Sequence, residues 1–89
     1  MKYVMFQDAK GVMFPVIFDD HLTHSMVTVE GCKAISAGFV DDIGQCWGRS
    51  ESLKLSADPI RDSDYVGAAL CNNTSMLNML RVMAMVEKR

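Results

Sequence analysis

The first half of the chain alternates apolar runs with short polar turns, which is the pattern of an antiparallel β-sheet. Residues 2–7 and 12–18 are rich in Val, Ile, Phe and Tyr, and they flank a turn that starts at Asp8 and ends at Gly11. An Asp start and a Gly end suit a type I turn closed by a left-handed residue, so we predict a β-hairpin. Pro15 has no N–H group, which indicates that the second strand lies at a sheet edge or is bulged there.

Further strands are predicted at residues 27–30, 33–40 and 45–49, and a short one where Leu53 and Leu55 alternate with polar neighbours. The small residues around Gly48 predict a bend or bulge between them. Before them, a pair of aspartates precedes a stretch that suits one or two helical turns, because an Asp caps free N–H groups. Together with the hairpin, these segments predict a mostly antiparallel sheet of four or five strands.

Two helices are predicted after the sheet. Asp58 suits a helix cap and proline is favoured at the first helical position, so we expect a helix over Pro59–Cys71. Asp62 and Asp64 then lie where the helix dipole favours negative charge. A polar stretch, Asn72–Ser75, ends that helix and offers caps for a second one over Ser75–Arg89, and a single bent helix is the alternative. The predicted fold class is α+β, an antiparallel sheet of four to five strands with two C-terminal helices packed on it.

The second predicted helix carries more apolar surface than a small domain can bury by itself. Placed at intervals of about 100°, its apolar side chains span an arc of roughly 200°, about twice the stripe of an ordinary surface helix. One flank can cover the sheet and the other requires a partner, so we predict a homodimer or a higher homo-oligomer. Ordinary core packing is the alternative. The predicted interface residues are Met76, Met79, Leu80, Met83, Met85 and Val86.

Composition narrows the classes of function. At 89 residues the chain forms one domain, residues 1–89, with a thin stability margin. A net charge of −2 provides no basic field, so nucleic acid is not an expected partner. We find no export signal and no apolar run of the roughly 20 residues that a membrane span needs, and therefore expect a cytoplasmic protein without a membrane partner. Cys32, Cys46 and Cys71 form no CxxC pair, which indicates reduced thiols.

Asp20, His21 and His24 are the one constellation with metal-ligand chemistry, because histidines three positions apart share a face of a helix. A metal site needs further convergent ligands, so helix caps and partly exposed histidines are the favoured interpretation, and we predict no metal or cofactor. Cys46 beside either histidine would be a thiol nucleophile. The ordinary interpretation of Cys46 is a small buried residue in a strand.

Trp47, Arg49, Ser50 and Ser52 form a candidate contact site, since they place hydroxyls and an arginine beside the only tryptophan. Such a set suits a small anion or a protein contact. The alternative is an exposed strand and turn whose serines bond locally and whose tryptophan anchors the core.

The chain also resembles a group of small uncharacterised proteins found in bacterial, phage and mobile-element genomes. The resemblance covers about residues 2–70 and is carried by four runs, Lys2–Phe6, Pro15–Phe18, Ser36–Val40 and Cys46–Leu53. It implies an accessory protein of mobile DNA, for which binding a host protein is a plausible role. It carries over no activity, cofactor or site residue.

We therefore hypothesise a non-enzymatic binding or assembly protein that self-associates through its Met-rich helix. One alternative is a small-molecule-binding module whose pocket, between sheet and helix, is lined by Met79, Met83, Phe39 and Trp47. Another is a metal- or thiol-dependent enzyme that uses His21, His24 and Cys46.

Overall fold

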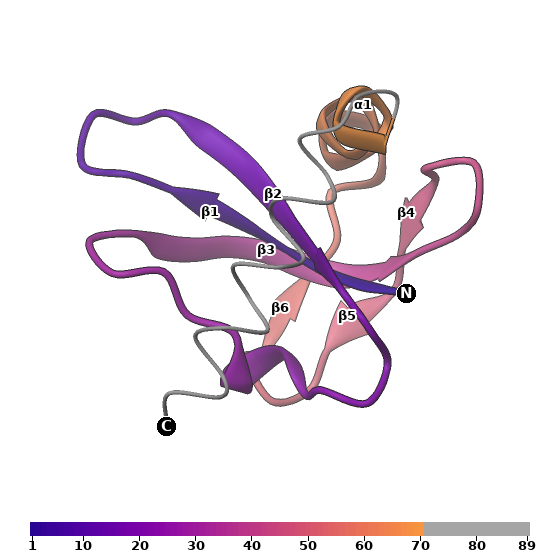
Figure 1. The fold of residues 1–89 in the computed structure, drawn as a ribbon, viewed down its shortest axis with the longest axis horizontal. Helices are drawn as coiled ribbons and strands as arrows, with labels where there is room; N and C mark the ends of the chain where they lie inside the picture. The colour runs from indigo at the N-terminus through magenta and orange to yellow at the C-terminus, as the bar shows by residue number, and fades with distance from the viewer. Residues whose placement is uncertain (71–89) are drawn as a thin grey trace.

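The computed structural model describes residues 1–70, and Figure 1 shows them as an antiparallel sheet with one α-helix lying across it. Four strands are hydrogen-bonded in the order β2-β1-β3-β4. A two-stranded ribbon, β5-β6, lies beside them. The fold is α+β, as predicted. The strands of the larger sheet are β1 (Lys2–Gln7), β2 (Met13–Phe18), β3 (Lys33–Val40) and β4 (Cys46–Trp47).

The hairpin of β1 and β2 confirms the prediction from the turn residues. Gly11 has φ +87° and donates its N–H to the Asp8 carbonyl over 3.0 Å. The Asp8 carboxylate accepts the N–H groups of Lys10 and Val12, each over 2.9 Å. β2 is an edge strand of the sheet, which is the position that Pro15 requires.

After β3 the chain makes a shorter strand than residues 45–49 predict. β4 ends at Trp47, because Gly48 adopts φ +77° and turns the backbone out of the larger sheet. The next two residues form β5 (Arg49–Ser50), which pairs with β6 (Leu55–Ser56) as a separate ribbon. The predicted bend at Gly48 is confirmed, and the single strand predicted at residues 45–49 is two strands that belong to different sheets.

The prediction of a strand at residues 27–30 is wrong. The preceding segment forms one 3-10 turn, η1 (His24–Met26), and the Val27 N–H closes it on the His24 carbonyl over 3.2 Å. Val27 is buried and Val29 packs against the same cluster. These valines cover the sheet from a loop, so their β propensity serves packing and not strand pairing.

The helix α1 (Pro59–Leu70) confirms the first predicted helix. The Asp58 carboxylate accepts the Arg61 N–H over 3.3 Å, as a cap does. The buried side of α1 carries Asp62, Val66 and Ala69. The second predicted helix, Ser75–Arg89, lies outside the described residues.

The sheet has a buried cluster on each side, because α1 covers one face, while η1 and the β5-β6 ribbon lie on the other (Figure 1). We call these the helix face and the aromatic face. Within residues 1–70, no helix is both long and apolar enough to cross a membrane. The helix face buries Tyr3, Met5, Ile17, Val40, Cys46, Val66 and Ala69. The aromatic face buries Val4, Phe6, Val16, Phe18, Val27 and Ala37.

Candidate functional site

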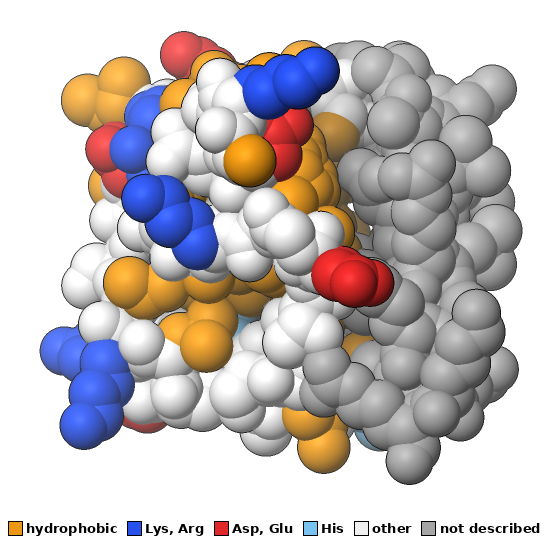
Figure 2. All heavy atoms as spheres, turned by 90° about the vertical axis from the view of Figure 1, so that its left-hand side faces the viewer, with side chains coloured by type: hydrophobic (Ala, Val, Ile, Leu, Met, Phe, Trp, Pro, Cys, Tyr) orange, Lys and Arg blue, Asp and Glu red, His pale blue; other side chains and the backbone are white. Residues whose placement is uncertain are grey.

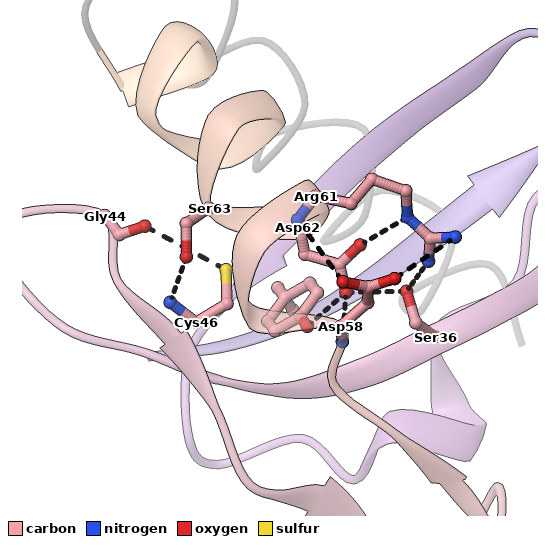
Figure 3. A network of polar contacts seen from close by, with 8 residues as sticks. Ser36, Gly44, Cys46, Asp58, Arg61, Asp62 and Ser63 are labelled. Carbon is pink, nitrogen blue, oxygen red and sulfur yellow. Dashed lines mark hydrogen bonds and ion pairs between the residues drawn. The ribbon is translucent and has the colours of Figure 1, made fainter.

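On the helix face, a polar cluster is closed around the carboxylate of Asp62, which is 0% exposed (Figure 3). One carboxylate oxygen accepts the Tyr3 hydroxyl over 2.5 Å, the Ser36 hydroxyl over 2.7 Å and the Asp58 N–H over 3.0 Å. The other oxygen accepts the Arg61 Nε–H over 3.1 Å. Tyr3 and Ser36 come from the two central strands, so the cluster joins the first turn of α1 to the middle of the sheet.

The electrostatics of this cluster favour the ionised carboxylate. Burial acts to raise the pKa of Asp62, but the hydrogen bonds from Tyr3, Ser36, the Asp58 N–H and Arg61 outweigh it, so the pKa lies below its usual value. Burial, with the hydrogen bond to Asp62, raises the pKa of the Tyr3 phenol. Arg61 also donates to the Ser36 hydroxyl over 3.0 Å. Each polar group in the cluster is thus hydrogen-bonded to another member of it. This arrangement suits a structural clamp between helix and sheet better than a reacting centre.

Cys46 lies beside this cluster, on the face of the sheet opposite His24. Its backbone N–H donates to the Ser63 hydroxyl over 2.9 Å, which covers the edge of β4 (Figure 3). Burial is the main cause that raises the pKa of the Cys46 thiol to about 11, so the thiol is protonated at neutral pH. Cys46 belongs to the helix-face cluster and His24 contacts Phe18 of the opposite cluster. The structure therefore does not bring Cys46 and His24 together, and the exposed His21 side chain pairs with Asp19.

The three metal-ligand candidates also have separate surroundings. His21 is an exposed side chain whose Nδ1 contacts the Asp19 carboxylate, and this partner raises the pKa of His21. Asp20 lies 3.7 Å from the N-terminal amine. His24 is only 4% exposed and uses Nε2 to donate to the Gly38 carbonyl over 2.8 Å. Within the part of the chain that the structure describes, no three His, Cys, Asp or Glu side chains converge as metal ligands.

The aromatic face carries a continuous row of four rings, Phe18, His24, Phe39 and Trp47, which we call the aromatic row. His24 stands edge-on between Phe18 and Phe39, with centroids 5.7 Å from each ring and interplanar angles of 82° and 84°. Phe39 and Trp47 are neighbours across the β3-β4 ladder, and their rings stack at 5.0 Å and 29°. The row begins at buried Phe18 and ends at Trp47, which is 55% exposed.

The predicted contact segment around Trp47 divides into exposed and buried members. Arg49 is exposed and pairs with Glu51 over 3.3 Å. Ser52 is exposed at the same turn. Ser50 is fully buried, and its hydroxyl accepts the Leu53 N–H over 3.2 Å, so it holds the turn and does not face a ligand.

A groove of about 520 Å³ opens at another end of the molecule, between the β1-β2 turn and Gly31–Lys33. Its walls include Gln7, Asp8 and the half-buried Cys32. Figure 2 shows this end, where Lys and Arg side chains are interspersed with acidic and apolar ones. The basic groups do not merge into a continuous field on this face.

The predicted interface residues, Met76, Met79, Leu80, Met83, Met85 and Val86, lie outside the described residues, as does Cys71. Of the predicted pocket, Phe39 and Trp47 are described, and they belong to the face opposite α1. Comparisons of the chain with protein-family models, with curated proteins and with solved structures found no match.

Sequence reasoning missed two features, the Asp62 cluster and the aromatic row. Asp62 carried a usable signal, because it lies at i, i+4 and i+7 spacing with Val66 and Ala69 on one side of the helix. An acid on an apolar stripe requires donors, which Tyr3 and Ser36 supply. The row had no such signal, since Phe18, His24 and Phe39 meet only through the tertiary fold.

Proposed function

We propose that the protein is a non-enzymatic binding and assembly protein that contacts a second copy of itself, with Trp47 at the centre of the contact. The observation that carries this proposal is the exposure of a large aromatic side chain at the end of a row whose other rings are packed. Tryptophan is enriched among the residues that dominate protein interfaces. The indole stacks on Phe39, and this contact reduces the side-chain entropy that is lost when a partner covers it.

A second line of support comes from the sequence. The predicted helix over Ser75–Arg89 has a wider apolar arc than one sheet can cover, and a domain of this size gains much from burying it in a partner. We propose that this helix takes part in the same association. The resemblance of residues 2–70 to proteins of phage and mobile elements supports a cytoplasmic accessory role in which a host protein is a further partner.

The test is the concentration dependence of the mass of the full chain, followed by light scattering and sedimentation over micromolar concentrations. Trp47→Ala is expected to weaken self-association about 30-fold, which corresponds to about 2 kcal/mol at an interface hot spot. Ile60→Ala is the matched control, because Ile60 is another exposed apolar side chain, on α1, at 84% exposure.

Leu80→Asp and Met83→Asp test the contribution of the predicted helix in the same assay. A chain that stays monomeric throughout the micromolar range would overturn the proposal. Association that Trp47→Ala leaves unchanged would remove Trp47 from the interface. Emission from Trp47, the only tryptophan, gives a second readout, because it should shift to the blue as the contact buries the indole.

A further inference from the structure

His24 occupies the middle of the aromatic row and is the one titratable group in it. Its ring makes a T-shaped contact with Phe18 on one side and with Phe39 on the other. Its Nε2–H donates to the Gly38 carbonyl over 2.8 Å. Gly38 precedes Phe39 on β3, so His24 holds both the backbone and the ring that support Trp47. Its own position is fixed by η1, whose Ser25 N–H donates to the Ser52 hydroxyl over 3.3 Å.

The surroundings of His24 suit the neutral imidazole and oppose the cation. β2 and β3 present the hydrocarbon rings of Phe18 and Phe39, and the β5-β6 turn presents the hydroxyl of Ser52 to η1. The charge that acts on His24 is that of Lys2 on β1, which is of the same sign as an imidazolium. His21 has the Asp19 carboxylate as its partner, whereas no ion pair of His24 is formed within residues 1–70. A buried cation without a counter-ion is strongly disfavoured.

We propose that neutral His24 is the positioning residue of the Trp47 contact surface, and that its protonation in mildly acidic solution withdraws η1 and releases the Phe39–Trp47 stack. This inference rests on the proposed function for its biological meaning, because it makes association through Trp47 dependent on pH. The structural change itself, the release of the Phe39–Trp47 stack, involves only the aromatic row and no partner. A pKa of His24 that burial lowers agrees with it.

The experiment follows the near-ultraviolet circular dichroism of Trp47 in the full chain, at a concentration where its measured mass is monomeric. Between about pH 7.5 and about pH 5, we expect reversible loss of the indole band, with a midpoint below the ordinary histidine value of about 6.5. The far-ultraviolet signal of the sheet reports whether the rest of the chain stays folded.

Two variants separate the two histidines of the chain. His21→Gln should keep the loss of the band, because His21 is exposed and lies outside the row. His24→Gln should abolish it, because an amide N–H can still donate to the Gly38 carbonyl but does not titrate in this range. A band that persists to about pH 5 in the wild-type chain, or a loss that persists in His24→Gln, would overturn the inference.

Should His24→Gln fail to fold, the His24 ring resonances of the His21→Gln chain decide the matter. Titration of His24 with an unchanged indole band contradicts the inference, and coincident midpoints support it. Because this readout uses no partner, its failure is distinct from a failure of the proposed function, which the Trp47→Ala masses report.

Discussion

One face of the sheet buries a carboxylate and the other buries an imidazole, and the two faces do so by opposite means. Asp62 on the helix face keeps its charge, because four donors surround the carboxylate. His24 on the aromatic face is held neutral between two phenylalanine rings with one carbonyl partner. Both side chains are buried, but one is charged and the other is neutral. The number of hydrogen-bond partners decides which protonation state the fold stabilises.

The two groups nevertheless share the direction of their pKa shift. The pKa of Asp62 is lowered because its donors outweigh its burial, and the pKa of His24 is lowered because burial outweighs the bond to Gly38. For both, the unfolded chain binds a proton more readily than the folded one. Each therefore contributes stability that is present above its unfolded pKa and is lost as the pH falls through its folded pKa.

The largest effect is expected from Asp62→Ala, which leaves the Tyr3 and Ser36 hydroxyls and the Asp58 N–H without their acceptor. Removing one partner from a buried charged cluster costs about 3 to 5 kcal/mol of unfolding free energy. Urea denaturation of the full chain measures it. Asp64→Ala, two positions along α1 at an exposed site, is the control and should change stability by no more than about 0.5 kcal/mol. Equal losses of unfolding free energy in the two variants would contradict a structural role for the Asp62 cluster.

A smaller effect is expected from Gly38→Ala, which displaces the backbone of the sheet and so disturbs the packing on both of its faces. A Cβ at this position would lie 2.4 Å from the Trp47 carbonyl oxygen and 3.2 Å from Ala57 Cβ, so β3 and β4 must move apart. Overpacking of this kind costs about 1 to 3 kcal/mol. Gly31→Ala gives a comparison without a steric clash, since nothing lies within 4 Å there, although its φ of +79° adds strain of its own. Near-ultraviolet dichroism of Gly38→Ala should show the loss of the Trp47 band.

The third prediction separates the two buried groups by pH. Unfolding free energy should decline as the pH falls below about 6.5 because of His24, and decline again below about 4 because of Asp62. His24→Gln should remove the first decline and leave the second, as measured by urea midpoints over the pH range. Since the exposed His21 is stabilised as a cation by Asp19, its contribution has the opposite sign, and His21→Gln should make the first decline steeper.

The sequence predicts those features of the fold that depend on residues close together in the chain, and it does not predict those that depend on distant ones. Gly11 and Pro15 act on their own neighbours, so the hairpin and its edge position were predictable, as was the start of α1 at Asp58. The small residues around Gly48 predicted a bend there, but they did not show that the strand divides at this glycine between two separate sheets. Val27 is buried without pairing, which apolar alternation does not distinguish from a strand. The clamp joins Tyr3, Ser36 and Asp62 across the whole domain, and only the spacing of Asp62 on its helix hinted at it.

The smallest effect is expected at Arg49, beside the exposed end of the aromatic row. The Arg49–Glu51 pair is in solvent, where screening and side-chain entropy cancel most of its attraction. Arg49→Ala should therefore change the unfolding free energy by less than about 0.5 kcal/mol, measured by urea denaturation at low and high salt. Because its stability effect is so small, any change that Arg49→Ala causes in self-association reports a contact and not a loss of fold. Unchanged association would exclude the Arg49 side chain from the proposed interface.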